Sequence, residues 1–199
     1  MTELAATPYV EPPEVGAKNL KLASQLWASA STFFFIAFLF AYFYLRTLDK
    51  KSAWHPHNVK APTTLGTVIA VVVVASAAAT WLAAKRLAAN DDAGFRSLGS
   101  AGLVLGLGAA VLQIVEWSTV GFGPTNGAFA SVFVGWTSVY FVFILGAMYW
   151  LETTLATSFR HRGSRDAGLQ IGAAADAAAF YWAIVSGIGV VTWFVLYLL

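Results

Sequence analysis

Long, uninterrupted apolar segments dominate the pattern of hydrophobic and polar positions along this chain. Short segments richer in Lys, Arg, Gly and Pro separate them. A helix needs about 20 apolar residues to cross the roughly 30 Å of hydrocarbon in a bilayer. The pattern therefore predicts five membrane-spanning helices, at about residues 22–45, 65–84, 98–117, 128–151 and 171–199.

The same pattern decides the kind of secondary structure. No segment shows the period-2 alternation that is typical of membrane-spanning strands. In lipid every backbone polar group must be paired within the protein, and helices meet that demand within one segment. We expect an all-α membrane protein with a single five-helix transmembrane domain at residues 21–199, preceded by a flexible cytoplasmic tail at residues 1–20.

Composition agrees with a membrane location. Hydrophobic residues make up 58% of the chain, charged residues make up 11%, and the mean hydropathy is +0.68. Soluble domains carry about 25% charged residues. The net charge of +2 gives no indication of a nucleic-acid partner. The chain has no cysteine, which excludes disulfides and thiolate chemistry.

Lys and Arg are distributed unequally between the two sets of loops, and this predicts the orientation. The tail and the two loops on its side carry eight: Lys18, Lys21, Lys85, Arg86, Arg96, Arg160, Arg162 and Arg165. The opposite side carries four: Arg46, Lys50, Lys51 and Lys60. Cytoplasmic loops are enriched in these residues, so we expect a cytoplasmic N-terminus and an extracytoplasmic C-terminus.

The residues that bind metals lie outside the predicted spans, with one exception. His55, His57 and His161 fall in loops, and Met148 is the one span methionine. A haem or copper centre within the membrane needs His, Met or Cys ligands there. We therefore expect no metal and no cofactor in this chain. The pair His55 and His57 could be a surface metal site, but a solvated loop explains it more simply.

One acidic residue lies deep in a predicted span. Glu116 follows Gln113 by three positions, so the two side chains share one helix face. Ionisable groups in spans are costly and usually face the bundle interior. The carboxyl could carry a proton or anchor buried hydrogen bonds. Alternatively, it could reach interfacial water or pair with a cation of the outer loop.

Small residues recur at helix-packing intervals in the third predicted span. Gly102, Gly106 and Ala110 are spaced four residues apart. Such a stripe lets two helix backbones approach closely. Packing within this chain explains the stripe more simply than a dimer contact. The chain carries no nucleophile elbow, P-loop, zinc-protease or dinucleotide motif, so we expect no active site of its own.

An ordered set of motifs resembles subunit III of the haem–copper terminal oxidases, the cytochrome c oxidase subunit III family, in its five-span form. The set comprises AYFYLR at 41–46, SAWHPHN at 52–58, GFRSL at 94–98, QIVEW at 113–117 followed by STVGFG, GAFASVFVGWTSVYFVFILGAMY at 127–149 and FYW at 180–182. Glu116 matches the glutamate that the family carries in this span.

Most other polar residues that the family carries within its spans are replaced here. Ser31 stands where the family usually has a buried glutamate, and Tyr140 and Phe143 stand where it has two histidines. Ala183 and Ser186 stand where it has a histidine and an aspartate. The resemblance thus implies a diverged packing subunit rather than one that supplies protons.

The resemblance also implies a complex and a location. We expect a non-catalytic accessory subunit of a bacterial aerobic respiratory oxidase, a multi-pass protein of the plasma membrane. Its partners would be a catalytic subunit I that holds two haems and copper, a subunit II and bound phospholipid. The resulting complex could belong to a larger respiratory supercomplex. Electrons would come from cytochrome c or a quinol.

Two alternatives stay open from the sequence. The chain could be the subunit III-like component of a nitric oxide reductase or of another respiratory complex. It could also be a small transporter. Transporters commonly have paired repeats with Gly- or Pro-broken spans, whereas five spans do not divide into equal halves and the prolines lie outside them.

Overall fold

The computed structural model is an all-α bundle, and it describes residues 12–48, 54, 59–160 and 165–199. Its helices are α1 (Pro13–Thr47), α2 (Thr63–Ala88), α3 (Asp92–Thr119), α4 (Ala128–Arg160) and α5 (Arg165–Trp193), followed by the π-helical segment η1 (Phe194–Leu198). Five helices are long and apolar enough to cross a membrane, the last of them continuing through η1. The predicted five-span all-α architecture is confirmed.

The helices extend beyond the predicted spans, and this corrects one expectation. Residues 13–20, which we expected to belong to a flexible tail, form the first turns of α1. Pro13 suits the first helical position because its missing N–H is not needed there, and Glu14 complements the positive end of the helix dipole. Residues 1–11 lie outside the described part of the chain, as do His55, His57 and His161.

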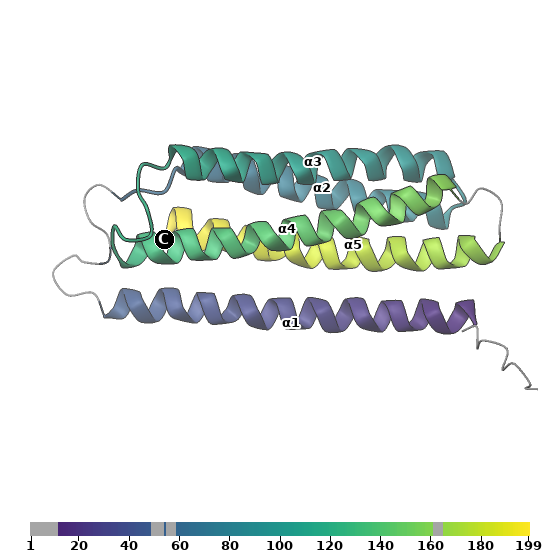
Figure 1. Ribbon diagram of the computed structural model, residues 1–199, viewed down its shortest axis with the longest axis horizontal. Coiled ribbons are helices and arrows are strands. Elements are labelled where there is room, and N and C mark those ends of the chain that lie inside the picture. Colours follow the sequence, from purple (N-terminus) through teal and green to yellow (C-terminus); the bar gives the residue numbers. More distant parts are fainter. Residues whose placement is uncertain (1–11, 49–53, 55–58, 161–164) are drawn as a thin grey trace, which may run out of the picture.

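The helices are arranged with α4 and α5 between α1 on one side and α2 and α3 on the other (Figure 1). The α5 helix contacts α1, α2 and α4, whereas α2 and α3 form the most closely packed pair. The beginning of α1 and the end of η1 lie at opposite ends of the bundle (Figure 1), as an odd number of spans requires.

A tight turn explains why α2 and α3 pack so closely. Asn90 adopts a left-handed conformation with φ of 61°, which asparagine tolerates better than most residues. Asp91 then caps α3, and its Oδ1 accepts a hydrogen bond of 2.8 Å from the backbone N–H of Gly94. The turn reverses the chain within a few residues and brings the two helices together.

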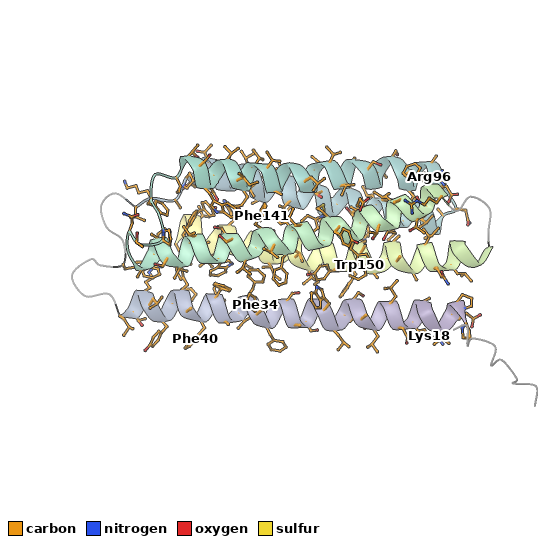
Figure 2. All side chains as sticks on the ribbon, in the orientation of Figure 1. Lys18, Phe34, Phe40, Arg96, Phe141 and Trp150 are labelled. Carbon is orange, nitrogen blue, oxygen red and sulfur yellow. The ribbon has the colours of Figure 1, made fainter. Side chains whose placement is uncertain are left out.

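Large side chains are divided between the core and the outer surface. Trp136, Trp182 and Phe133 are buried, whereas Phe40 is 69% exposed and projects away from the bundle (Figure 2). An apolar outer surface is stable against lipid, where burying it would gain little. Polar contacts and close packing must therefore specify how the helices fit together.

Candidate functional site

The most unusual buried group is the carboxyl of Glu116 on α3, which is 0% exposed. Gln113 lies one turn earlier and donates from Nε2 to Glu116 Oε2 at 2.5 Å. The hydroxyl of Tyr197 in η1 lies 2.7 Å from Oε1 and 2.8 Å from Oε2. The predicted shared face of Gln113 and Glu116 is present, and the carboxyl joins α3 to the end of the last helix.

Two local features bring Tyr197 to this position. The chain widens into a π-helical segment over Phe194–Leu198, which changes the direction of the side chains relative to a regular helix. On α2, Gly66 leaves room for the aromatic ring, because a Cβ at that position would overlap the Tyr197 ring. Phe133 packs edge-on against the ring with a centroid distance of 5.5 Å.

The surroundings of Glu116 discriminate between the interpretations left open by the sequence. A fully buried side chain does not reach interfacial water. Within the described part of the chain, the ion pair found is Arg86 with Asp91 at 3.6 Å, and no cation contacts Glu116. The geometry is that of a carboxyl held by uncharged hydrogen-bond donors. This arrangement fits a buried hydrogen-bond anchor and a proton-carrying carboxyl, and it disfavours contact with interfacial water or an outer-loop cation.

At four other contacts between helices, a hydroxyl oxygen accepts a hydrogen bond from a tryptophan indole N–H. In each pair the indole Nε1 donates to a hydroxyl oxygen on a different helix, at 2.9–3.0 Å. The pairs are Trp182 with Ser76, Trp136 with Thr192, Trp117 with Thr137 and Trp193 with Thr67. Such hydrogen bonds specify helix partners in lipid, where apolar contact alone does not.

The small-residue stripe of α3 lies at one of these contacts. Ser76 on α2 donates to the backbone carbonyl of Gly102 at 2.6 Å, and a Cβ at Gly102 would crowd Thr80. Gly106 faces another helix, because a Cβ there would overlap Met148 of α4. Ala110 is buried on the same stripe. These residues pack against helices of the same chain.

The replaced family positions fall mainly between α1, α4 and α5. Ser31 is buried and donates to the carbonyl of Trp27 at 2.7 Å. Tyr140 donates to the carbonyl of Val185 at 3.3 Å, and Phe143 packs against Phe35 with centroids 5.1 Å apart. Ser186 is buried beside Val185.

Ala183 differs from the other replaced positions because it lies on the exposed face of α5. Contacts between α1, α4 and α5 involve Ser31, Tyr140 and Phe143, and Ser186 is buried on α5. Aromatic packing and backbone hydrogen bonds fill that interface.

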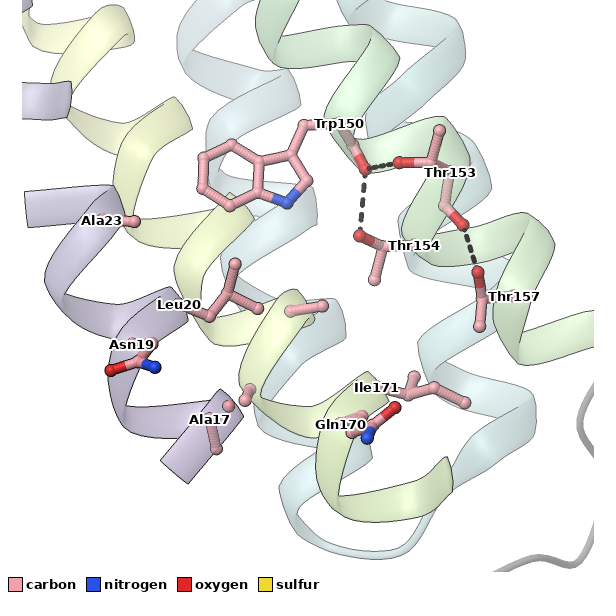
Figure 3. Close-up of a pocket in the computed structure, with 13 residues that line it drawn as sticks. Ala17, Asn19, Leu20, Ala23, Trp150, Thr153, Thr154, Thr157, Gln170 and Ile171 are labelled. Atoms are coloured by element: carbon pink, nitrogen blue, oxygen red, sulfur yellow. Dashed lines mark hydrogen bonds between the residues drawn. The ribbon is translucent and has the colours of Figure 1, made fainter. Parts of the chain in front are cut away.

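A pocket of about 640 Å³ opens at the end of the bundle where α1 begins, α4 ends and α5 begins (Figure 3). Its polar residues from α4 are three threonines whose hydroxyl protons are already used. Thr153 and Thr154 donate to the carbonyl of Trp150, both at 2.9 Å, and Thr157 donates to the carbonyl of Thr153 at 2.8 Å. The threonine oxygens therefore face the pocket as acceptors.

The other pocket residues make a polar rim over an apolar interior. Asn19 and Gln170 are exposed and lie on α1 and α5, whereas Trp150 and Ile171 lie farther inside (Figure 3). The volume is within the range of about 300–1,000 Å³ that small-molecule pockets occupy. A polar rim with an apolar interior suits an amphiphile. The sequence patterns did not reveal this pocket, because its residues come from three helices far apart in the chain.

The donor set of the described residues does not fit a haem or a copper ion. No group of three or more His, Cys, Asp or Glu side chains comes together among residues 12–48, 54, 59–160 and 165–199. The buried carboxyl of Glu116 is surrounded by an amide and a phenol, which are not the ligands that haem iron or copper prefers.

A comparison with known protein families decides what kind of protein this is. The profile described as cytochrome c oxidase subunit III matches residues 12–199, nearly the whole chain. The chain belongs to the cytochrome c oxidase subunit III family. The resemblance drawn from the ordered motifs is therefore confirmed. The search of curated proteins returned no match.

Membership of the cytochrome c oxidase subunit III family gives the bundle a context. It implies association with oxidase subunits in a membrane. The five long apolar helices agree with the five-span form of the family. The buried carboxyl of Glu116 and the pocket between α1, α4 and α5 can both be explained without a redox centre in this chain.

Proposed function

We propose that this chain is a non-catalytic accessory subunit III of a bacterial aerobic terminal oxidase in the plasma membrane. Its task is to stabilise the catalytic subunit by helix packing and by contacts with lipid. The family match over residues 12–199 is the observation that carries this proposal. Subunit I would hold the haems and copper, subunit II would complete the oxidase, and electrons would come from cytochrome c or a quinol.

The hydrogen bonds between helices within the bundle agree with the proposed role of stabilising the catalytic subunit. The hydroxyls of Ser76, Thr137 and Thr192 each accept an indole N–H from another helix, and Glu116 joins α3 to η1. These bonds hold one arrangement of five helices. A rigid bundle gives a partner subunit a fixed surface to pack against.

The distribution of charge supports an orientation with the beginning of α1 in the cytoplasm. Lys18 and Lys21 lie at that end of α1, and Lys85 and Arg86 lie at the same end of α2. Positive charge is enriched on the cytoplasmic side of membrane proteins. The rim of the pocket would then lie at the cytoplasmic leaflet.

The pocket between α1, α4 and α5 supports phospholipid binding. Gln170 lies exposed in its lining and can pair with ester or glycerol oxygens, and the exposed Lys18 and Lys21 at the same end of α1 would add a positive charge that attracts an anionic phosphate. An acyl chain would lie along Trp150 and Ile171. The pocket would thus hold a lipid as part of the subunit.

The test is the composition of the complex after mild detergent extraction through an affinity tag on this chain. We expect a haem-containing polypeptide in equimolar amount, together with oxygen consumption. Recovery of a haem-free homo-oligomer would contradict the proposal. Reduction of nitric oxide by the purified complex would instead identify a nitric oxide reductase as the partner.

A deletion distinguishes an accessory subunit from a catalytic one. Without this chain, the haem spectrum of the partner should be unchanged, but the apparent melting temperature and yield of the complex should fall. A changed haem spectrum with unaltered thermal stability would assign the chain a direct role at the redox centres.

A further inference from the structure

A second, much smaller cavity lies inside the bundle, beside the residues that hold Glu116. Its volume is about 20 Å³, and residues of α2, α3, α4, α5 and η1 line it. A buried water needs about 10–15 Å³. The cavity is therefore large enough for one water molecule and too small for a lipid chain or an organic ligand.

One polar atom of the residues that line this cavity, Gln113 Oε1, receives no hydrogen bond from the described side chains. Gln113 lines it and is 2% exposed. Its Nε2 donates to Glu116, but none of the described side chains donates to its Oε1. Gln113 lines the cavity, and an amide oxygen that lacks a hydrogen-bond donor in such a place costs about 1–3 kcal/mol. A donor placed in the cavity would recover that cost.

The hydroxyls that line the cavity do not provide this donor. Thr137 donates to the carbonyl of Phe133 at 2.8 Å, and Thr192 donates to the carbonyl of Ile188 at 2.8 Å. Both already use their protons on their own helices, although each oxygen can still accept.

The hydroxyl groups of the two tyrosines that line the cavity also have their own hydrogen-bond partners. Tyr140 donates to the carbonyl of Val185 at 3.3 Å, and Tyr197 bonds to Glu116. The hydroxyl protons of the lining are thus already used, and the oxygen atoms remain as acceptors.

We propose that this cavity binds one water molecule, which donates to Gln113 Oε1 and to a hydroxyl oxygen of the lining. Water has the required size and two donors. It would connect the Glu116 network of α3 to the hydroxyls of α4 and α5. With a hydroxyl of α4 as the second acceptor, the fixed unit would then include three helices instead of two.

A substitution that fills the cavity tests for the water. Val73 lines the cavity and is 1% exposed, so Val73→Ile adds one methylene at this point. If water is present, Val73→Ile expels it, leaves Gln113 Oε1 without a donor and lowers the apparent melting temperature by about 2–4 °C. If the cavity is empty, filling it raises the melting temperature, and the proposal fails.

Two further variants separate loss of water from simple crowding. Val74→Ile adds the same methylene on the exposed side of α2 and should leave the melting temperature unchanged. Gln113→Met removes the amide oxygen that needs the donor, so Val73→Ile should no longer be destabilising in that background. An equal loss in both backgrounds would indicate overpacking and would overturn the proposal.

Infrared spectroscopy can identify the molecule in the cavity directly. The sample is the purified complex, including the subunits that copurify with this chain. Infrared difference spectra before and after exchange into H₂¹⁸O should show an isotope-shifted water band in the wild type and in Val74→Ile, but not in Val73→Ile. Because oxygen acceptors also bind cations, the melting temperature is compared in sodium and potassium. A sodium-specific shift that Val73→Ile abolishes would assign the cavity to a cation instead.

Discussion

Tyr197 and Glu116 are 81 positions apart in the chain, and their side chains are joined by a hydrogen bond of 2.7 Å inside the bundle. The bond connects η1 with α3, so the last helical segment is fixed to a helix near the middle of the sequence. The Tyr197 hydroxyl lies within 2.8 Å of both carboxyl oxygens of Glu116. We expect this pair to contribute to the stability of the bundle, because it links segments far apart in the sequence.

Tyr197→Phe tests this relationship with the least change in shape. The variant keeps the ring but removes the hydroxyl, so Glu116 retains only the bond from Gln113. We expect a loss of about 1–2 kcal/mol, seen as a lower apparent melting temperature of the purified particle. Tyr149→Phe is the matched control, because Tyr149 is 70% exposed on the outer surface of α4. Equal melting temperatures for the two variants would refute the role given to the Tyr197 hydroxyl.

Substitutions of Glu116 separate hydrogen bonding from charge. Glu116→Gln keeps an oxygen that can accept from Tyr197, and it should be recovered in the membrane at close to wild-type amounts. Glu116→Leu leaves the donors of Gln113 and Tyr197 unpaired, and its yield should fall several-fold. Immunoblots of membrane fractions measure both. If Glu116→Gln were as poorly recovered as Glu116→Leu, the carboxyl would have a function beyond anchoring.

Gly66 provides a steric test of the same contact. A Cβ at position 66 would overlap the ring of Tyr197, so Gly66→Ala should displace the ring and lower the apparent melting temperature. Gly146→Ala on α4 is the control, because a Cβ there meets nothing within 4 Å. Alanine forms helices better than glycine, so the control should be neutral or slightly stabilising. A stable Gly66→Ala variant would show that η1 can shift without cost.

The sequence was sufficient to predict the five spans, because their length and apolarity are local properties. It also predicted that Gln113 and Glu116 share a face, since that follows from helical periodicity. It could not predict that Tyr197 completes the site, because nothing local connects residues in α3 and η1. The early start of α1 at Pro13 was also missed, because a helix can continue past the hydrocarbon that defines a span.

The large pocket was unpredictable for a related reason. Trp150, Gln170 and Leu20 each look unremarkable in their own helices, and they line one pocket only because α1, α4 and α5 diverge at one end. The motifs that indicated the family lie elsewhere. Family resemblance and local pattern therefore identified the fold, whereas the interior sites required the three-dimensional arrangement.

Ser76 links three helices, and a double-mutant cycle can measure that link. It accepts from Trp182 of α5 at 3.0 Å and donates to Gly102 of α3 at 2.6 Å. Ser76→Ala should lower the melting temperature because the buried indole N–H loses its partner. Trp182→Phe in the Ser76→Ala background should then cost less than in the wild type. Strictly additive effects would mean that the two side chains do not interact energetically.

The lipid pocket is tested by filling it. Ala174 lines the pocket on α5, and Ala174→Phe would occupy the space proposed for an acyl chain. We expect the purified particle to retain about one fewer phospholipid, as measured by mass spectrometry of the extracted lipids, with unchanged helix content by circular dichroism. Ala183→Phe lies on the exposed face of the same helix and should retain the wild-type number. Because both variants add the same ring to the same helix, a general loosening of the annular lipid would affect them equally. Equal lipid content in the two would therefore show that the pocket does not hold a specific lipid, whatever the partner of this subunit.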